Sequence, residues 1–268
     1  MSSVSRDNRA ALRRDVEAQI TSITLAIAEE ILSVATLLAD EKALRTALAD
    51  AGQPVSAREA LVKDVLGSRV NPTTLSLLIA AVSARWSDAD ELLDAVEELG
   101  AIAAFCAAEN SGTLDRVEEE LFRFGRAVEV NPSLQMTLTD PALAPAGKAA
   151  VVKDLVAATA APATTAVLTH VASNLRGRRV DAAVTNLSNL AAAQRERVVA
   201  QVRVAIDLDA AQRERMARAL ARLTGREVRL DIAVDPSVIG GASVRIGDDV
   251  IDGTMVTRLT QARRTLVG

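Results

Sequence analysis

The chain has 268 residues, of which 49% are hydrophobic and 25% are charged, and this composition is typical of a folded protein with two or three domains. Aromatic residues make up 1% of the chain, which disfavours binding of single-stranded nucleic acid by base stacking. The net charge of -4 provides no global basic surface for a phosphate backbone, so we expect no nucleic-acid partner.

The chain carries a single cysteine, Cys106, and a single histidine, His170. One cysteine excludes an intrachain disulfide and a cysteine-rich zinc site, and one histidine excludes a histidine metal cluster. These counts fit a reducing, cytoplasmic compartment. The polar N-terminal segment lacks the apolar run of a signal peptide, and no 18 uncharged apolar residues occur in a row. We therefore expect no direct membrane insertion, so that any work at a membrane would depend on another chain.

From residue 16 to residue 201, apolar residues recur at the spacing of amphipathic helices, which are separated by short segments with Pro or Gly. Two capping-box patterns predict helix starts, Ser56 with Glu59 and Ser87 with Asp90. One helical stripe consists of Ile20, Ile23, Ile27, Ile31, Val34 and Leu38. This part of the chain is predicted to form a helical bundle.

The sequence of the helical region contains an internal repeat at a constant offset of 90 residues. Residues 29–32 correspond to residues 119–122, and residues 62–65 correspond to residues 152–155. Because buried and surface positions coincide at one fixed offset, chance similarity between alanine-rich helices explains the match poorly. The sequence predicts two copies of one helical bundle.

After about residue 201 the apolar residues alternate, as in strands, at residues 202–208 and 228–234. Asp209 is expected to cap a helix between these strands and Gly225 to end it. A hairpin with a turn at 247–249 and a final amphipathic helix over 256–266 follow. The predicted fold class is mainly α with a small α+β C-terminal domain, in which two tandem helical bundles precede a short sheet with helices. The predicted domains are residues 1–100, 101–198 and 199–268.

The segment Asp235-Pro236-Ser237-Val238-Ile239-Gly240-Gly241, with residues 244–248, 251–254 and 258–266, resembles the C-terminal signature of the delta subunit of F-type ATP synthases. This family includes the mitochondrial oligomycin-sensitivity-conferring protein. The resemblance extends upstream to about residue 100, and the enlarged form is similar to actinobacterial members. Residues 1–100 are then an additional N-terminal bundle, which leaves open which bundle makes the family's usual contact.

The resemblance implies a peripheral-stalk (stator) subunit that links the catalytic head of a proton-translocating ATP synthase to its b-type stalk subunits. The helical bundle is then expected to bind the N-terminal segments of the alpha subunits, and the C-terminal domain to bind the b-type helices. The implied protein is non-catalytic, with no cofactor, metal or small-molecule substrate, and lies peripherally at the cytoplasmic face of the plasma membrane. The alternatives are a generic helical interaction scaffold with an α+β tail, and an enzyme, for which we find no nucleophile or metal constellation.

Two sets of residues are candidates for function. For head binding we select the first and fifth helices of the second copy, at Ala101, Ala104, Ala108, Leu168 and Val171. The signature residues are interpreted as determinants of turns and strand ends. These are Asp235, Pro236, Gly240, Gly241, Gly247, Asp248, Asp252 and Gly253.

Other conspicuous residues are interpreted as structural. His170 is expected to be a surface or partly buried residue, Cys106 a small core residue and Trp86 a core residue near a helix boundary. Gly147-Lys148 lacks the other elements of a phosphate-binding loop and is interpreted as a loop-to-helix junction. The basic cluster from Arg195 to Arg222 is interleaved with acidic residues, which favours a solvated or partner-facing helix.

Overall fold

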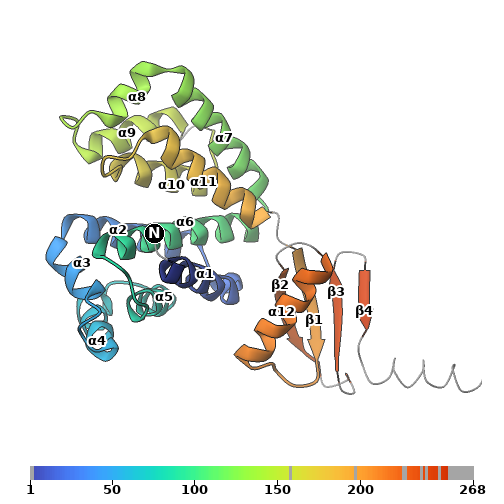
Figure 1. The fold of residues 1–268 in the computed structure, drawn as a ribbon. Coiled ribbons are helices and arrows are strands. Elements are labelled where there is room, and N and C mark those ends of the chain that lie inside the picture. Colours follow the sequence, from blue (N-terminus) through green and yellow to red (C-terminus); the bar gives the residue numbers. More distant parts are fainter. Residues whose placement is uncertain are drawn as a thin grey trace, which may run out of the picture. The chain divides into compact units, whose positions relative to one another are not determined.

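The computed structural model describes residues 3–156, 159–195, 198–224, 228–235, 238, 241–246 and 249–252. The chain divides into two compact units, unit 1 (Met1–Arg195) and unit 2 (Glu196–Gly268). Unit 1 is helical and unit 2 combines helix and sheet, which confirms the predicted fold class (Figure 1). None of the described helices is both long and apolar enough to span a bilayer.

Unit 1 consists of eleven described α-helices and one 3-10 turn, η1 (Ile20–Ser22). The helices are α1 (Ser3–Ala18), α2 (Leu25–Asp40), α3 (Lys42–Ala49), α4 (Val55–Leu66), α5 (Pro72–Ser83), α6 (Ala89–Asn110), α7 (Leu114–Val130), α8 (Pro132–Thr139), α9 (Pro145–Val156), α10 (Pro162–Ser173) and α11 (Val180–Arg195). One continuous hydrophobic core joins them.

The duplication predicted from the sequence is present in the helices. The pairs α3 and α8, α4 and α9, and α5 and α10 each begin 90 residues apart and have equal lengths. In both copies the second helix packs against the third, fifth and sixth helices. The two copies therefore share one topology.

A repeated pair of hydrogen bonds supports this correspondence. In the first copy, Glu30 Oε2 accepts from Thr74 Oγ1 at 2.6 Å and from the backbone N–H of residue 71 at 2.8 Å. In the second copy, Glu120 Oε2 accepts from Thr164 Oγ1 and from the N–H of residue 161 at the same two distances. A carboxylate on the second helix thus satisfies the free N–H at the start of the fifth helix in both copies.

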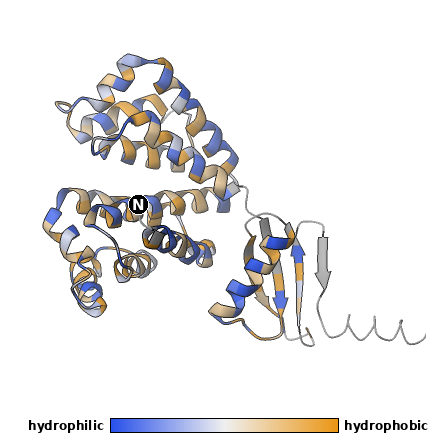
Figure 2. Cartoon of the chain, in the orientation of Figure 1, coloured by the Kyte–Doolittle hydropathy of each residue, from blue (hydrophilic) through white to orange (hydrophobic). Residues whose placement is uncertain are grey.

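The long helix α6 belongs to both copies. Subtracting 90 from the bounds of α11 (180–195) gives 90–105, and adding 90 to those of α1 (3–18) gives 93–108. Both ranges lie inside α6 (89–110), which is therefore the sixth helix of the first bundle and the first helix of the second. Every residue from 99 to 106 is buried, as expected of a central helix. In Figure 2 the visible side of α6 is coloured mostly toward the hydrophobic end of the scale. Residue 100, the predicted boundary between the bundles, lies inside this helix.

Unit 2 contains a four-stranded sheet in the order β2-β1-β3-β4. Its elements are β1 (Val198–Val204), α12 (Ala210–Thr224), β2 (Val228–Val234), β3 (Ala242–Ile246) and β4 (Asp249–Asp252). Strands β1 and β2 are parallel and are joined through α12, whereas β3 pairs antiparallel with both β1 and β4. The core lies between the sheet and α12, around Val202, Val244 and Leu220.

Three local predictions need correction. Asp88, not Ser87, caps α6, because its Oδ1 accepts from Glu91 N at 2.8 Å. Helix α4 begins at Val55 after Pro54, so Ser56 lies inside it and not at its cap. The first strand ends at Val204, and Ile206 lies beyond it, 79% exposed.

The remaining predictions for unit 2 have mixed outcomes. The cap at Asp209 is confirmed by Gln212 N, which donates to its Oδ1 at 2.7 Å, and by the reciprocal bond from Asp209 N to Gln212 Oε1. Gly225 and the predicted final helix over 256–266 lie outside the described residues.

Candidate functional site

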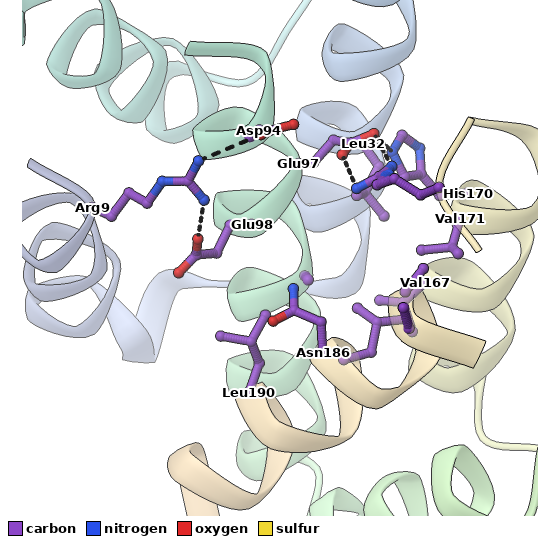
Figure 3. Close-up of a pocket in the computed structure, with 15 residues that line it drawn as sticks. Arg9, Leu32, Asp94, Glu97, Glu98, Val167, His170, Val171, Asn186 and Leu190 are labelled. Carbon is purple, nitrogen blue, oxygen red and sulfur yellow. Dashed lines mark hydrogen bonds and ion pairs between the residues drawn. The ribbon is translucent and has the colours of Figure 1, made fainter. Parts of the chain in front are cut away.

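A cavity of about 250 Å³ lies beside α6 at the junction of the two bundles (Figure 3). Apolar side chains from α2, α6, α10 and α11 line it together with charged side chains from α1 and α6. The lining residues are Arg9, Leu32, Asp94, Glu97, Glu98, Ala101, Val167, His170, Val171, Arg178, Ala182, Ala183, Asn186, Leu187 and Leu190. We take this cavity as the candidate site because it is concave, mostly apolar and edged by a few polar groups.

An ion-pair network around Glu97 forms one side of the cavity. Glu97 is 9% exposed, and its Oε2 lies 2.6 Å from Arg176 Nη2 and 2.9 Å from Arg178 Nη1. Its Oε1 lies 3.5 Å from His170 Nε2, and Arg176 also pairs with Asp94 at 2.6 Å. Arg176 and Arg178 lie in the loop between α10 and α11, and Glu97 lies on α6. The network therefore joins that loop to the shared helix.

The network determines the ionisation of its members. Burial raises the pKa of Glu97, but the hydrogen bond from His170 and the charges of Arg178 and Arg176 together lower it more. The pKa of Glu97 therefore lies below its ordinary value of 4.5. Burial lowers the pKa of Arg176, but its bonds to Asp94 and Glu97 raise it above the ordinary value. Glu97 is thus a buried, ionised anion at neutral pH.

The same loop contains backbone strain. Arg176 has a φ of +50°, in the left-handed region that non-glycine residues rarely adopt, and Gly177 follows with a φ of +77°. The two ion pairs of Arg176 hold the chain in this conformation. The ion pairs of Arg176 therefore account for its strained backbone conformation.

The remaining charges of the cavity are also paired. Arg9 Nη1 lies 2.7 Å from Glu98 Oε2, and Arg9 Nη2 lies 3.7 Å from Asp94. Together with Arg176 of the network, which does not line the cavity, Arg9 and Arg178 pair with the three carboxylates Asp94, Glu97 and Glu98. Over the described ranges, no three His, Cys, Asp or Glu side chains are grouped so as to hold a metal ion.

The structure buries all five residues predicted to bind the head. The exposed fractions are 0% for Ala104, 1% for Leu168, 2% for Ala108, 3% for Ala101 and 9% for Val171. Ala101 and Val171 lie together in the cavity wall, whereas the other three do not line it. Their contact with a partner stays a prediction.

Three of the eight signature residues can be placed. Asp235 N donates to Val204 O at 2.8 Å at the end of β2, and Asp252 is the last residue of β4. Gly241 has a φ of +82° directly before β3, a conformation that favours glycine. Pro236, Gly240, Gly247, Asp248 and Gly253 lie outside the described residues.

The residues interpreted as structural have structural positions. Cys106 is fully buried, and Trp86 is 5% exposed with its Nε1 donating to Ala81 O at 2.8 Å. The His170 side chain is 8% exposed within the Glu97 network. Gly147 lies in the first turn of α9. Sequence reasoning missed the Glu97 network, because its members are about 80 residues apart and carry no motif.

Comparison of the sequence with known proteins finds a matching family and close relatives in sequence. Residues 96–266 match the family described as ATP synthase delta (OSCP) subunit. The ATP synthase subunit delta of Streptomyces griseus is 40% identical over 271 residues, which cover 100% of both chains. That of Streptomyces avermitilis is 40% identical over 265 residues, which cover 98% of this chain and 97% of the relative.

Among solved structures, a chain from the cryo-EM structure of the Toxoplasma gondii mitochondrial ATP synthase hexamer is 21% identical. The match covers 64% of this chain and 97% of that chain with a TM-score of 0.29, which supports no conclusion about fold or function. The family match over more than half of the chain and the full-length relatives agree with each other. The chain therefore belongs to the ATP synthase delta (OSCP) subunit family.

Proposed function

We propose that this chain joins the catalytic head of an F-type ATP synthase to the b-type stalk subunits, with unit 1 binding the head and unit 2 binding the stalk. Its function is that of a peripheral-stalk subunit of the synthase. The observation that carries the assignment is the relationship to delta subunits along the whole chain, the added N-terminal bundle included. A generic helical scaffold would not require this relationship.

The proposed role is non-catalytic. The charged groups around the candidate site are paired with one another, and the delta subunits to which the chain is related support a structural role in the synthase. We place the chain peripherally at the cytoplasmic face of the plasma membrane, held there by its partners. In this proposal the chain connects two assemblies, the catalytic head and the b-type stalk.

The two separate hydrophobic cores support a role in which each unit binds a different partner. Unit 1 and unit 2 each have their own hydrophobic core, so each can present a surface to a different partner. Within unit 1, contact of the head at Ala101, Ala104, Ala108, Leu168 and Val171 stays a prediction at the residue level.

The experiment is a binding assay with two fragments, residues 1–195 and residues 196–268, and the full chain as the positive control. Each is tested against the isolated catalytic head and against the b-type subunits. We expect fragment 1–195 to keep head binding and lose stalk binding, and fragment 196–268 to do the reverse. Binding of the head by fragment 196–268, or of both partners by each fragment, would contradict the proposal.

A further inference from the structure

Helix α2 of the first bundle also packs on the second bundle. It lies along α6 and contacts α10. Leu32 of α2 is 6% exposed and fits against Gly100, where an added Cβ would lie 2.6 Å from Leu32 Cδ2. One turn further, Thr36 Oγ1 accepts from Asn174 Nδ2 at 3.1 Å and lies 3.5 Å from His170 Nδ1. Figure 3 shows Leu32 beside His170 and Glu97.

The face of the second bundle that receives α2 consists of Gly100, Ala101, His170 and Asn174, and we call it the α6–α10 face. Gly100 and Ala101 are small, so the backbone of α6 can approach a neighbouring helix closely. This face lies between the first and fifth helices of the second bundle, where the predicted head-binding positions also lie. A helix of the same chain already packs there.

Comparison of α2 with its repeat α7 shows one difference on the side toward the second bundle. At the positions that face their own bundles both helices are apolar and buried, with Ile27, Ile31, Val34 and Leu38 in α2 and Val117, Leu121, Phe124 and Val128 in α7. At the positions that face the α6–α10 face the two helices differ.

The position of α2 that lines the cavity together with α10 is Leu32, which is buried. Its equivalent in α7 is Phe122, which is 63% exposed. A buried apolar side chain thus occurs at this position in the copy whose second helix contacts a neighbouring bundle.

From this difference we infer that α2 is a permanent internal occupant of the α6–α10 face, and that the catalytic head binds unit 1 elsewhere than at the positions predicted from the sequence. This inference rests on the proposed function for its second half. Displacing α2 would expose Ala28, Leu32 and Ala35 to water and would also break its packing on α3, α5 and α6, so an incoming helix would not exchange with it at equilibrium.

The first test measures occupancy in the full chain without any partner. We expect Gly100→Ala to lower the melting temperature by several degrees, because its methyl group meets Leu32, and to lower it much less in a Leu32→Ala background. Phe122→Ala is the matched control, since its exposed side chain occupies the equivalent position on α7 and should leave the effect of Gly100→Ala unchanged. An equal effect of Gly100→Ala in the wild-type and Leu32→Ala backgrounds would overturn the inference.

The second test locks α2 in place. Thr36→Cys and Asn174→Cys are joined by a short bis(methanethiosulfonate) crosslinker, which forms a disulfide with each thiol and releases methanesulfinate. Binding of the isolated catalytic head is measured before and after reduction of these disulfides. We expect the two affinities to agree within about twofold. Loss of binding in the crosslinked protein that reduction restores would show that the head displaces α2, and the inference would be wrong. A wild-type chain that binds no head would contradict the proposed function, and the melting experiment would still decide the position of α2.

Discussion

Glu97 is a charged residue inside the helical unit, and its partners explain how it is tolerated there. Its Oε2 lies 2.6 Å from Arg176 Nη2 and 2.9 Å from Arg178 Nη1. These ion pairs offset the free-energy cost of removing the carboxylate from water. The three residues come from α6 and from the loop between α10 and α11. A single buried carboxylate therefore connects the shared helix to a strained loop of the second bundle.

Replacing Glu97 by Gln should lower the free energy of unfolding at pH 7 by about 1–3 kcal/mol, because two arginines lose their charged partner while their side chains stay partly buried. Because the pKa of Glu97 is lowered in the folded state, its ionic contribution is complete above the unfolded value near 4.5. That contribution is lost as the pH falls through the lower, folded pKa. The difference between wild type and variant should therefore stay constant from pH 7 down to about pH 5 and shrink as the pH falls below the unfolded value near 4.5.

Chemical denaturation at several pH values measures this difference. Glu119→Gln is the matched control, because Glu119 pairs with Arg123 at the surface, where both side chains are more than half exposed. Its effect should stay within about 0.5 kcal/mol at every pH. A difference for Glu97→Gln that grows on acidification would contradict our account of the network.

At the scale of elements, the repeated bond between the second and fifth helices is the clearest trace of the duplication. Glu30 and Glu120 each accept the hydroxyl of a threonine in the first turn of a proline-initiated helix. Burial raises the pKa of Glu120, but its hydrogen bonds from Thr164 and the N–H of residue 161 lower it more, so the carboxylate is ionised. The same charged acceptor therefore fixes α5 on α2 and α10 on α7.

Thr74→Val and Thr164→Val should destabilise the protein equally, by about 1.5–3 kcal/mol each, since each removes one hydrogen bond to a carboxylate and leaves the backbone bond in place. Thermal unfolding of the two variants measures this. Thr165→Val, whose hydroxyl donates to the backbone at Ala161, is the neighbouring control and should cost less. Markedly unequal losses at Thr74 and Thr164 would show that the two bonds are not energetic equivalents.

At the scale of the whole molecule, the sharing of α6 makes the two bundles one structural unit. The buried residues Leu92, Val96 and Leu99 lie in the range equivalent to the sixth helix, and Phe105 lies where the ranges of both copies overlap. A single core cluster includes residues of both bundles. The added bundle is therefore packed on the second bundle through a shared helix and a shared core.

Cutting the chain after residue 100 should therefore yield two fragments that do not fold independently, because the cut divides a helix that both bundles bury. We expect residues 1–100 and residues 101–195 each to show little cooperative thermal unfolding by circular dichroism, and residues 1–195 to unfold in one transition. Two separately folded fragments with their own sharp transitions would instead support domains that divide at residue 100.

The sequence by itself determined the helical class, the duplication, the α+β end and the family resemblance. These features depend on local periodicity, on similarity at a fixed offset and on a contiguous signature. All three can be recognised from the order of the residues alone. The cap at Asp209 was also predictable, since a capping box is a contact over three residues. The cap of α6 was placed one residue early because Ser87 and Asp88 are both good N-cap residues.

Only the tertiary structure decided how the two copies are joined. A repeat of 90 residues with six helices per copy predicts separate bundles, but every residue of α6 from 99 to 106 is buried and the helix serves both bundles. The positions predicted to contact a partner, such as Ala101 and Val171, are buried beside α2 and α11, since helical periodicity gives an apolar face without naming the helix that covers it. The Glu97 network joins residues about 80 positions apart, and packing alone brings such distant charges together.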